Sequence, residues 1–363
     1  MKNTIGNNVS VTLFGESHGV ALGAVLDGIA PGIEVDKDFI ASQLALRRSV
    51  GEISTPRKET DEFEILSGVF EGKTTGTPIC IVIPNKDTKS KDYSEMRSKA
   101  RPAHADFTAF EKYNGFEDYR GGGHFSGRIT AGIVAVGAIA ISALRKKGIL
   151  IGTHIAKCGG VEDASFSDFE NQIKSLNSKT FAVIDDDKAE EMRNKILSAK
   201  ADNDSVGGVL ETAIVGIPSG VGEPWFDTLE GMISKGLFSI PAVKGVEFGA
   251  GFSIADMLGS QANDCFYAEN GKVFTETNNN GGINGGITNG MPIVFKVAVK
   301  PTPTIAKKQK TIDFKTKENT EILSLGRHDP CIVHRARVVV DSITAIVLCD
   351  MLATKFGTDW LSK

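Results

Sequence analysis

The sequence predicts a single α/β domain, spanning residues 1–363, in which β-sheets enclose a layer of buried helices. With 363 residues, 41% of them apolar, the chain can form one large core. Two segments, 129–144 and 338–352, are apolar almost all round, which in a globular protein indicates helices covered on every side. Predicted strands and helices are interleaved, but without the regular βα alternation of a dinucleotide-binding fold.

The first predicted elements are a strand and a helix. Residues 9–14 alternate and are rich in β-forming types, so they predict a strand that leads into the segment GESHG at 15–19. A helix is expected to begin at Asp36, its N-cap, and to end at Arg47 and Arg48, whose cations suit the negative end of the helix dipole.

Later elements are predicted by similar signals. Capping-box patterns at Ser167 and Asp187 predict the starts of two amphipathic surface helices. Residues 206–217 and 291–299 predict strands. Long polar or glycine-rich stretches predict loops that act as lids or are ordered by ligands, at 49–58, 84–101, 252–290 and 300–317.

Composition and charge restrict the class of protein. There are 41 Lys and Arg against 45 Asp and Glu, a net charge of −4, which argues against a general nucleic-acid binder. The five cysteines are scattered, without a CxxC pair, and are interpreted as reduced thiols of a cytoplasmic protein. No stretch has the length and apolar character of a signal peptide or of a membrane span.

The segment GESHG fits the G-x-S-x-G pattern of a nucleophile elbow, with Ser17 as the nucleophile of a serine hydrolase. The context does not fit, because an elbow joins a mid-chain strand to a helix and residue 17 leaves no room for earlier strands. A plain glycine turn explains Gly15 and Gly19 but not why Glu, Ser and His lie between them.

Two other segments resemble phosphate-binding motifs without matching them. GKT at 72–74 lacks the glycine that a phosphate loop needs at Ser67, and GGGHFSGR at 121–128 has Ser126 where the dinucleotide pattern needs its last glycine. A glycine-rich turn that opens a buried helix still presents N–H groups and a positive dipole end to an anion. A simple helix-entry turn would not account for His124, Ser126 and Arg128 together.

Histidines are concentrated in turns marked by Gly, Arg or Pro, where active sites are often found; these are His18, His104, His124 and His328. A lone histidine is more often structural than catalytic, but four such turns in one chain favour function. No HExxH motif, cysteine cluster or carboxylate triplet has ligand spacing, so no metal site is predicted.

Arginines lie singly beside these turns, in a pattern that fits bidentate recognition of carboxylates and phosphates better than a solvated charged face. They are Arg47, Arg48, Arg57, Arg101, Arg120, Arg128, Arg327 and Arg335. KPTPT at 300–304 adds a cation and hydroxyls on a loop stiffened by prolines. The inferred ligand is a small polyanion.

Ordered motifs along nearly the whole chain make it resemble the chorismate synthase family. They are NTIG at 3–6, GESHGVALG at 15–23, EILSGVFEGKTTGTPI at 64–79, RPAHAD at 101–106, DYRGGG at 118–123, DSVGG at 204–208, AVKGVEFGAGF at 242–252, GGINGGITNG at 281–290, KPTPTI at 300–305 and GRHDPC at 326–331. The resemblance implies a layer of helices sandwiched between antiparallel sheets, and a homotetramer.

The resemblance also implies conversion of 5-enolpyruvylshikimate 3-phosphate to chorismate by 1,4-elimination of phosphate. It further implies that reduced FMN is required, although the reaction has no net redox change. Nothing resembles an added reductase domain, so we expect FMNH2 to come from an external flavin reductase, with NADPH involved only indirectly. No nucleic-acid or membrane partner is expected.

Site residues are carried over from the family position by position. His18 would protonate or hold the reduced flavin, His104 would act as acid toward the departing phosphate, and Asp329 would assist removal of the ring proton. Ser17 and Ser126 would relay protons. The flavin site would comprise His124, Phe125, Ser126, Pro241, Ala242, Gly285, Lys300, Pro301, Thr302, Pro303, Thr304 and Arg327. The substrate side would comprise Arg47, Arg48, Arg57, Arg128 and Arg335.

Two departures from the family pattern concern these sites. The family commonly reads GGGRSSAR where this chain has GGGHFSGR, so His124 replaces an arginine and Phe125 a serine. The loop after Arg48 is shorter than the common form and lacks one of its arginines.

Two rival classes remain. A phosphate-handling hydrolase would use Ser17 or a metal and would be active without flavin. A non-enzymatic anion-binding module, for example for RNA, would need exposed aromatics among its basic residues, whereas the basic turns here are rich in Gly, His and Pro.

Overall fold

The structure is a computed structural model that describes residues 2–55, 59–86, 98–324 and 329–363. Its larger sheets each have five strands, antiparallel throughout. The first sheet has the order β1 (Thr4–Ile5), β2 (Ser10–Gly15), β3 (Ala21–Asp27), β7 (Ile79–Pro84) and β4 (Glu64–Ile65). The second has the order β11 (Val243–Phe248), β16 (Ile293–Val299), β10 (Gly208–Val215), β8 (Leu150–Cys158) and β9 (Val161–Glu162).

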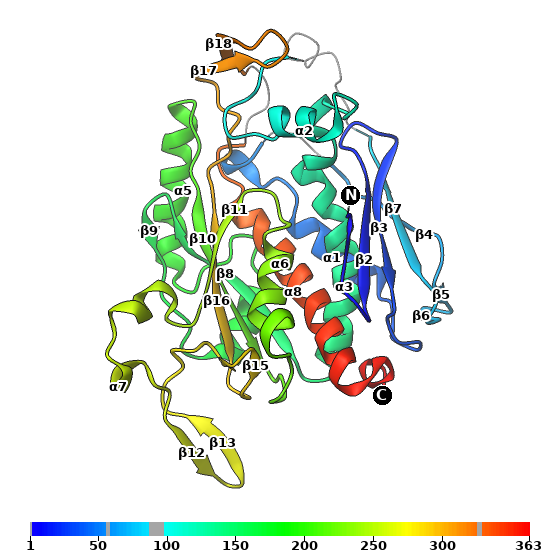
Figure 1. The fold of residues 1–363 in the computed structure, drawn as a ribbon, viewed down its shortest axis with the longest axis vertical. Helices are drawn as coiled ribbons and strands as arrows, with labels where there is room; N and C mark the ends of the chain where they lie inside the picture. The colour runs from blue at the N-terminus through cyan, green and yellow to red at the C-terminus, as the bar shows by residue number, and fades with distance from the viewer. Residues whose placement is uncertain (1, 56–58, 87–97, 325–328) are drawn as a thin grey trace.

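Helices fill the space between the two sheets (Figure 1). The helices of this layer are α1 (Lys37–Leu46), α3 (Thr130–Lys146), α6 (Leu229–Leu237) and α8 (Val333–Phe356). Helices α4 (Phe169–Leu176) and α5 (Asp186–Ala201) cover the outer face of the second sheet, while α2 (Asp106–Tyr113) and the short α7 (Gly259–Ala262) lie at the periphery. The predicted layer of helices between sheets is confirmed.

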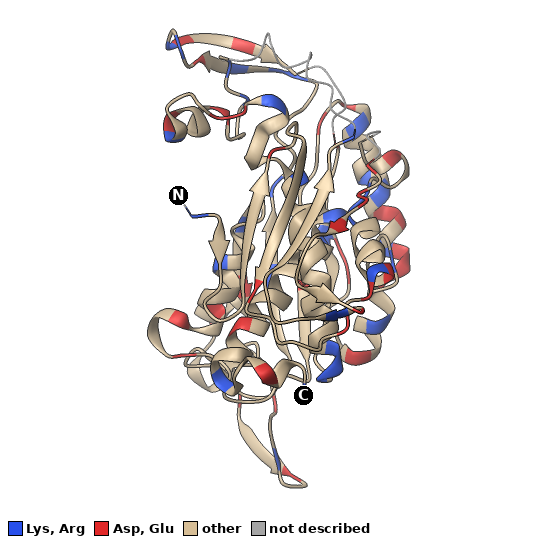
Figure 2. Cartoon of the chain, turned by 90° about the vertical axis from the view of Figure 1, so that its right-hand side faces the viewer, with Lys and Arg blue, Asp and Glu red and all other residues tan. Residues whose placement is uncertain are grey.

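Burial follows the layers. In β16, Ile293, Phe295, Val297 and Val299 are buried and alternate with half-buried residues, as expected for a strand with one face on the core. Helix α3 is buried almost all round, as predicted. Contrary to the sequence-based expectation, the segment Gly127–Lys146 is apolar and long enough to cross a membrane, but 89% of its most apolar window is buried inside the protein, as in a core helix. Charged residues of both signs lie mainly on peripheral helices and loops (Figure 2).

Several predicted elements are confirmed and some boundaries are wrong. Helix α1 begins after Asp36, whose carboxylate accepts the N–H groups of Asp38 and Phe39. Helix α8 begins at Val333, five residues before the predicted apolar segment. The capping boxes are wrong: Asp185 rather than Asp187 caps α5, and the N–H of Ser167 is bound by Gln172 Oε1. In both cases another side-chain oxygen, Gln172 Oε1 or Asp185 Oδ1, accepts the backbone N–H that the glutamate of the predicted capping box would have bound.

The long stretches predicted as loops contain hairpins. Besides β5 (Val69–Phe70) and β6 (Lys73–Thr74), two-stranded pairs are formed by β12 (Phe266–Glu269) with β13 (Lys272–Thr275), β14 (Ile283–Asn284) with β15 (Ile287–Thr288), and β17 (Lys308–Asp313) with β18 (Glu318–Leu323). Pair β12–β13 forms an arm that projects from the molecule (Figure 1). Such short strands have too few residues for a clear period.

Candidate active site

A cavity of about 680 Å³ lies beside the N-terminal half of α8. Seven residues on its wall carry or can accept a positive charge: Lys2, Arg47, His104, His124, Lys244, Lys300 and Arg335. None of the described residues that line it is Asp or Glu. The cavity therefore suits a small ligand with several negative charges.

Apolar residues line another part of this cavity. They are contributed by β2, α3 and α8, and include Leu13, Ile133, Val339 and Ile343. The volume lies within the range of about 300–1,000 Å³ that is usual for small-molecule sites, which combine apolar walls with a few polar groups. The cavity can hold a ligand with an apolar ring and charged substituents.

A triple-glycine turn lies between two of the predicted catalytic histidines. Gly121, Gly122 and Gly123 have φ values of 59°, 86° and 53°, which glycine adopts without strain. A Cβ atom on Gly121 would lie 2.2 Å from His18 Cε1, and one on Gly122 would lie 3.1 Å from His104 Cε1. Side chains at these positions would displace the imidazoles, so the glycines bring both rings close to the turn.

Ser17 and His18 lie behind this turn rather than on the cavity wall. Ser17 is fully buried and His18 is 9% exposed. The Ser17 hydroxyl donates to the carbonyl of Arg120 at 3.1 Å and also lies 3.1 Å from His18 Nδ1. The hydroxyl has only one proton, and it uses this proton for the bond to the carbonyl. Its oxygen must therefore accept in the contact with His18, so His18 Nδ1 carries a proton and donates it.

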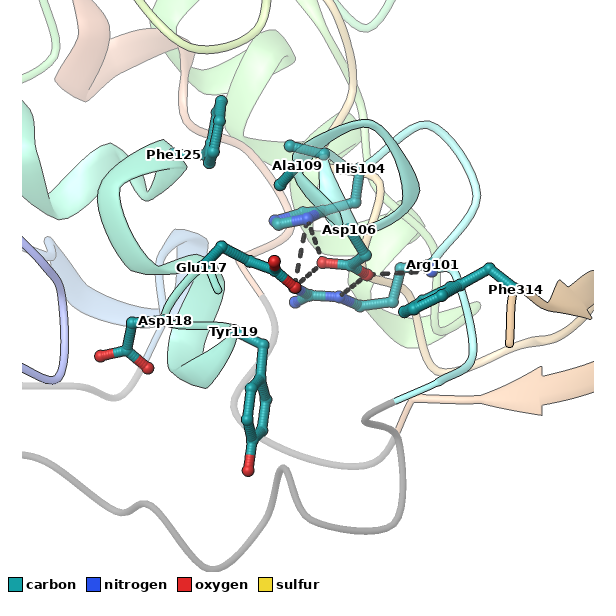
Figure 3. Close-up of a pocket in the computed structure, with 11 residues that line it drawn as sticks. Arg101, His104, Asp106, Ala109, Glu117, Asp118, Tyr119, Phe125 and Phe314 are labelled. Atoms are coloured by element: carbon teal, nitrogen blue, oxygen red, sulfur yellow. Dashed lines mark hydrogen bonds and ion pairs between the residues drawn. The ribbon is translucent and has the colours of Figure 1, made fainter. Parts of the chain in front are cut away.

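His104 lies where the large cavity meets a smaller cleft of about 30 Å³ (Figure 3). Its Nδ1 is 2.8 Å from Asp106 Oδ1 and 3.1 Å from Arg101 Nη2. Burial by itself would raise the pKa of Asp106, but the hydrogen bonds and charges of Arg101 and His104 outweigh burial and hold that pKa well below its usual value.

Asp329 lies next to the cavity and is bound by a cavity residue. Arg335 Nη1 contacts Asp329 Oδ2, and Arg335 Nε donates to the carbonyl of Arg47 at 2.9 Å. Burial raises the pKa of Asp329 above its usual value, although Arg335 and backbone N–H groups oppose this rise. A carboxyl group with a raised pKa is suited to proton transfer.

Two of the predicted substrate arginines share a buried carboxylate. Asp61 Oδ2 lies 3.2 Å from Arg47 Nη2, and Asp61 Oδ1 contacts Arg128 Nη1. Arg128 also lies 3.4 Å from Glu59 Oε2 and is not on the cavity wall, whereas Arg47 is. Burial lowers the pKa of Arg47 to about 10, so it remains charged at neutral pH.

The segments at 241–242 and 300–304 form another part of the wall. The N–H of Lys300 donates to the carbonyl of Ala242 at 2.9 Å, which joins the two segments. Lys300 Nζ contacts the carbonyl of Ala103. In the part of the chain that the structure describes, the buried Thr302 Oγ1 has no hydrogen-bond partner, so this hydroxyl is available to a ligand.

The structure thus brings most of the predicted site residues to one cavity. Its wall includes Arg47, His104, His124, Phe125, Ser126, Pro241, Ala242, Lys300, Thr302, Pro303, Thr304 and Arg335. Seven predicted site residues that the structure describes do not line this wall: Ser17, His18, Arg48, Arg128, Gly285, Pro301 and Asp329. Of these, Gly285 lies in the turn between β14 and β15. Arg57, Arg327 and His328 lie outside the described residues.

Comparison with known proteins agrees with this geometry. The family model for chorismate synthase matches residues 9–353. The chain is 46% identical over 347 residues to the chorismate synthase of Thermococcus kodakarensis, covering 96% of each chain. The chain belongs to the chorismate synthase family.

Other relatives support the same assignment. The chorismate synthase of Methanobrevibacter smithii is 46% identical over 351 residues, again covering 96% of each chain. A crystal structure of chorismate synthase superposes with a TM-score of 0.77 at 33% identity, covering 98% of this chain and 94% of that one. As a member of the chorismate synthase family, the chain is an enzyme of the lyase class that serves chorismate formation in the shikimate pathway.

Some residues in or beside the cavity of this chorismate synthase family member were not identified from the sequence. Lys2 and Lys244 add positive charge to the wall, and Asp61 pairs with two arginines from distant segments. A lysine in a strand is usually solvated, so Lys244 carried no signal of its own. Within the described ranges, no group of three or more His, Cys, Asp or Glu residues could hold a metal ion.

Proposed function

We propose that this enzyme converts 5-enolpyruvylshikimate 3-phosphate to chorismate by 1,4-elimination of phosphate, with reduced FMN required and no net redox change. The observation that carries the proposal is the charge of the cavity, where seven cationic or imidazole residues and no described acidic residue line the wall. The substrate has a phosphate and two carboxylates, which such a wall would neutralise.

The residues present fit FMN. The apolar residues of the cavity suit a flat ring system, while Lys300 and the unpartnered hydroxyl of Thr302 suit a phosphate. Pro241 and Ala242 would support the ring from the facing segment, with His124 and Phe125 on the glycine-turn side. When bound, reduced FMN supplies the transient electron that makes phosphate a feasible leaving group.

The roles of the protein's own groups follow from their surroundings. His104 would donate a proton to the departing phosphate, and Arg47 and Arg335 would stabilise the charge that develops on it. Asp329, whose pKa burial raises, would receive the ring proton.

The remaining predicted residues act around these groups. His18, bonded to Ser17, would hold a proton near the flavin, and Ser126 would relay protons. The other proposed substrate contacts are Arg48, Arg57 and Arg128, and the other proposed flavin contacts are Gly285, Pro301 and Arg327.

The cellular setting is part of the same proposal. The 363 residues would act as one domain in a cytoplasmic homotetramer that receives FMNH2 from an external flavin reductase. NADPH would act only through that reductase. The five cysteines support a reducing compartment, because all are free thiols in the structure.

An anaerobic assay tests the proposed reaction. Purified protein with excess chelator would receive 5-enolpyruvylshikimate 3-phosphate with and without chemically reduced FMN. We expect chorismate only with reduced FMN. Product formed without flavin, or activity abolished by the chelator, would instead favour the phosphate-handling hydrolase.

A second assay tests the source of the electrons. Protein supplied with oxidised FMN and NADPH under anaerobic conditions, without another reductant, is expected to form no chorismate. Turnover there would show that this chain reduces flavin itself.

A further inference from the structure

A polar cluster beside the large cavity, on the wall of the small cleft, is formed by the first residue of α2 and two residues of the loop before it. Arg101 binds both carboxylate oxygens of Asp106, through Nε at 2.7 Å and Nη2 at 2.6 Å, and its backbone N–H adds a third bond at 3.0 Å. His104 Nδ1 lies 2.8 Å from the same carboxylate (Figure 3). These four contacts leave the carboxylate little freedom to rotate.

The tautomer of His104 follows from this arrangement. An ionised carboxylate can only accept hydrogen bonds, and a guanidinium can only donate them. Asp106 is the nearer of the two partners of Nδ1, at 2.8 Å against 3.1 Å for Arg101 Nη2. The proton of a neutral His104 ring therefore lies on Nδ1, which leaves Nε2, beside Gly122, as the atom that exchanges protons.

We infer that Asp106, held in place by Arg101, is a positioning residue. It accepts the Nδ1 proton of His104 and so fixes the ring with Nε2 as the exchanging atom: the imidazolium gives its Nε2 proton to the departing phosphate and becomes the neutral Nδ1–H form. The inference rests on the proposed function, in which His104 acts on the departing phosphate. Asp106 is not on the wall of the large cavity, so it acts through His104 rather than on the substrate.

Neighbouring acidic groups do not replace Asp106. Glu117, Asp118 and Tyr119 also line the small cleft. Asp118 is engaged by Arg120 at 2.7 and 2.8 Å. Glu117 points toward the cluster in Figure 3, but its buried Oε2 has no hydrogen-bond partner among the residues that the structure describes. Asp106 is thus the carboxylate that holds the imidazole.

The first experiment compares the variant Asp106→Asn with wild type in the anaerobic assay with reduced FMN. We expect kcat to fall about 100-fold, the lower end of what a positioned acid or base contributes, with KM for the substrate unchanged. The matched control is Asp163→Asn, which breaks another carboxylate–imidazole contact of 2.8 Å, to His154, away from the cavity. This control is expected to keep its kcat.

The second readout is the ¹⁵N NMR spectrum of the histidine rings, with His104 assigned by His104→Ala. In the wild type we expect a protonated Nδ1 with its proton shifted downfield by the carboxylate, and in Asp106→Asn a loss of that shift. If Asp106→Asn does not fold, Arg101→Lys, which removes the two-point grip on Asp106, is measured for the same two effects, with a fall in kcat of about 10-fold.

The outcomes separate the two ideas. Wild-type kcat in the variant, a change confined to KM, or an unchanged Nδ1 signal would overturn the positioning role. If the wild type itself forms no chorismate, the proposed function fails, while the NMR signal still decides whether Asp106 fixes the tautomer of His104.

Discussion

At the scale of single residues, the glycine turn at 121–123 sets how closely the two predicted catalytic histidines approach each other. Its backbone passes between His18 and His104, and neither ring could keep its place beside a larger residue. The pKa values of two carboxyl groups of the site are shifted in opposite directions: Arg101 and His104 lower the pKa of Asp106, whereas burial raises the pKa of Asp329. Opposite pKa shifts of this kind suit Asp106 to hold the proposed acid His104 and suit Asp329 to accept a proton.

Substituting Gly121→Ala tests the role of the turn. Its Cβ would lie 2.2 Å from His18 Cε1, so the ring must move, and we expect kcat in the anaerobic assay to fall by about 100-fold or more. Gly271→Ala serves as control, because Gly271 also has a positive φ (73°) but no atom within 4 Å of its added Cβ. Equal turnover in both variants would show that the position of His18 is not critical.

Substituting Arg335→Gln tests the proton-accepting role of Asp329. Arg335 opposes the rise that burial causes in the pKa of Asp329, so its removal should raise that pKa further. The base form then requires higher pH, and the acidic limb of the pH profile of kcat/KM should move upward. The measurement is this profile for wild type and variant; a limb that stays in place would assign it to another group.

At the scale of elements, the core depends on the close approach of α3 and α8. A Cβ atom on Gly137 of α3 would lie 2.4 Å from Ser342 Cβ and 2.8 Å from Ser342 Cα on α8. A larger residue would force these two buried helices apart. Because α3 and α8 both line the cavity, their separation also sets its width.

We therefore expect Gly137→Ala to lower the free energy of unfolding by about 1–3 kcal/mol, the usual cost of overpacking. Urea denaturation measures it. Gly259→Ala is the control, since no heavy atom lies within 4 Å of its added Cβ. A Gly137→Ala protein as stable as the control would mean that the helices tolerate a wider spacing.

Strands β8 and β10 carry a buried charged cluster in the second sheet. His154 Nδ1 lies 2.8 Å from Asp163 Oδ2, and its Nε2 lies 2.9 Å from Glu211 Oε2. Burial by itself would lower the pKa of His154, but the hydrogen bonds to both carboxylates outweigh burial and raise it. The stability that protonated His154 contributes is therefore complete below its unfolded pKa of about 6.5 and is lost as pH rises through the raised folded pKa.

Substituting His154→Gln should cost about 3 kcal/mol at pH 6, because Asp163 and Glu211 both lose the imidazolium that they bind, while Lys296 stays 3.9 Å from Glu211 Oε1. The difference in stability between variant and wild type should shrink as pH rises from about 6.5 through the raised folded pKa of His154. Urea denaturation across this pH range measures both proteins. A difference that is independent of pH would mean that folding does not raise the pKa of His154.

At the scale of the whole molecule, several large apolar side chains remain exposed in a single chain. Trp225 and Phe226, before α6, are 85% and 96% exposed, and Phe252, Leu258 and Phe266 are also exposed. Exposed apolar groups of this size are typical of surfaces that other protein chains cover. They are consistent with the homotetramer that the family resemblance implies.

Light scattering or sedimentation should accordingly give a mass about four times the 38.7 kDa of one chain. Replacing Phe226 by Asp would place a charge where apolar contact is expected and should shift the distribution toward smaller species. A monomer in the wild-type protein at micromolar concentration would contradict the predicted assembly.

The sequence by itself determined the layered class of the fold, because all-round apolar segments such as 129–144 can only be core helices and the strand at 291–299 keeps its period of two. It also determined the family, and through the family many of the residues that line the cavity. These properties depend on local periodicity and on motifs that are contiguous in the chain.

Only the tertiary structure decided how those residues meet. That Arg47 and Arg128 share Asp61, that Lys244 joins the cavity wall, and that Asp106 holds His104 through its Nδ1 depend on side-chain distances. Cap positions such as Asp185 in place of Asp187 depended likewise on which acceptor lay nearest. Contacts between distant segments arise from the packing of the two sheets on one helical layer, and the spacing of residues along the chain does not contain that information.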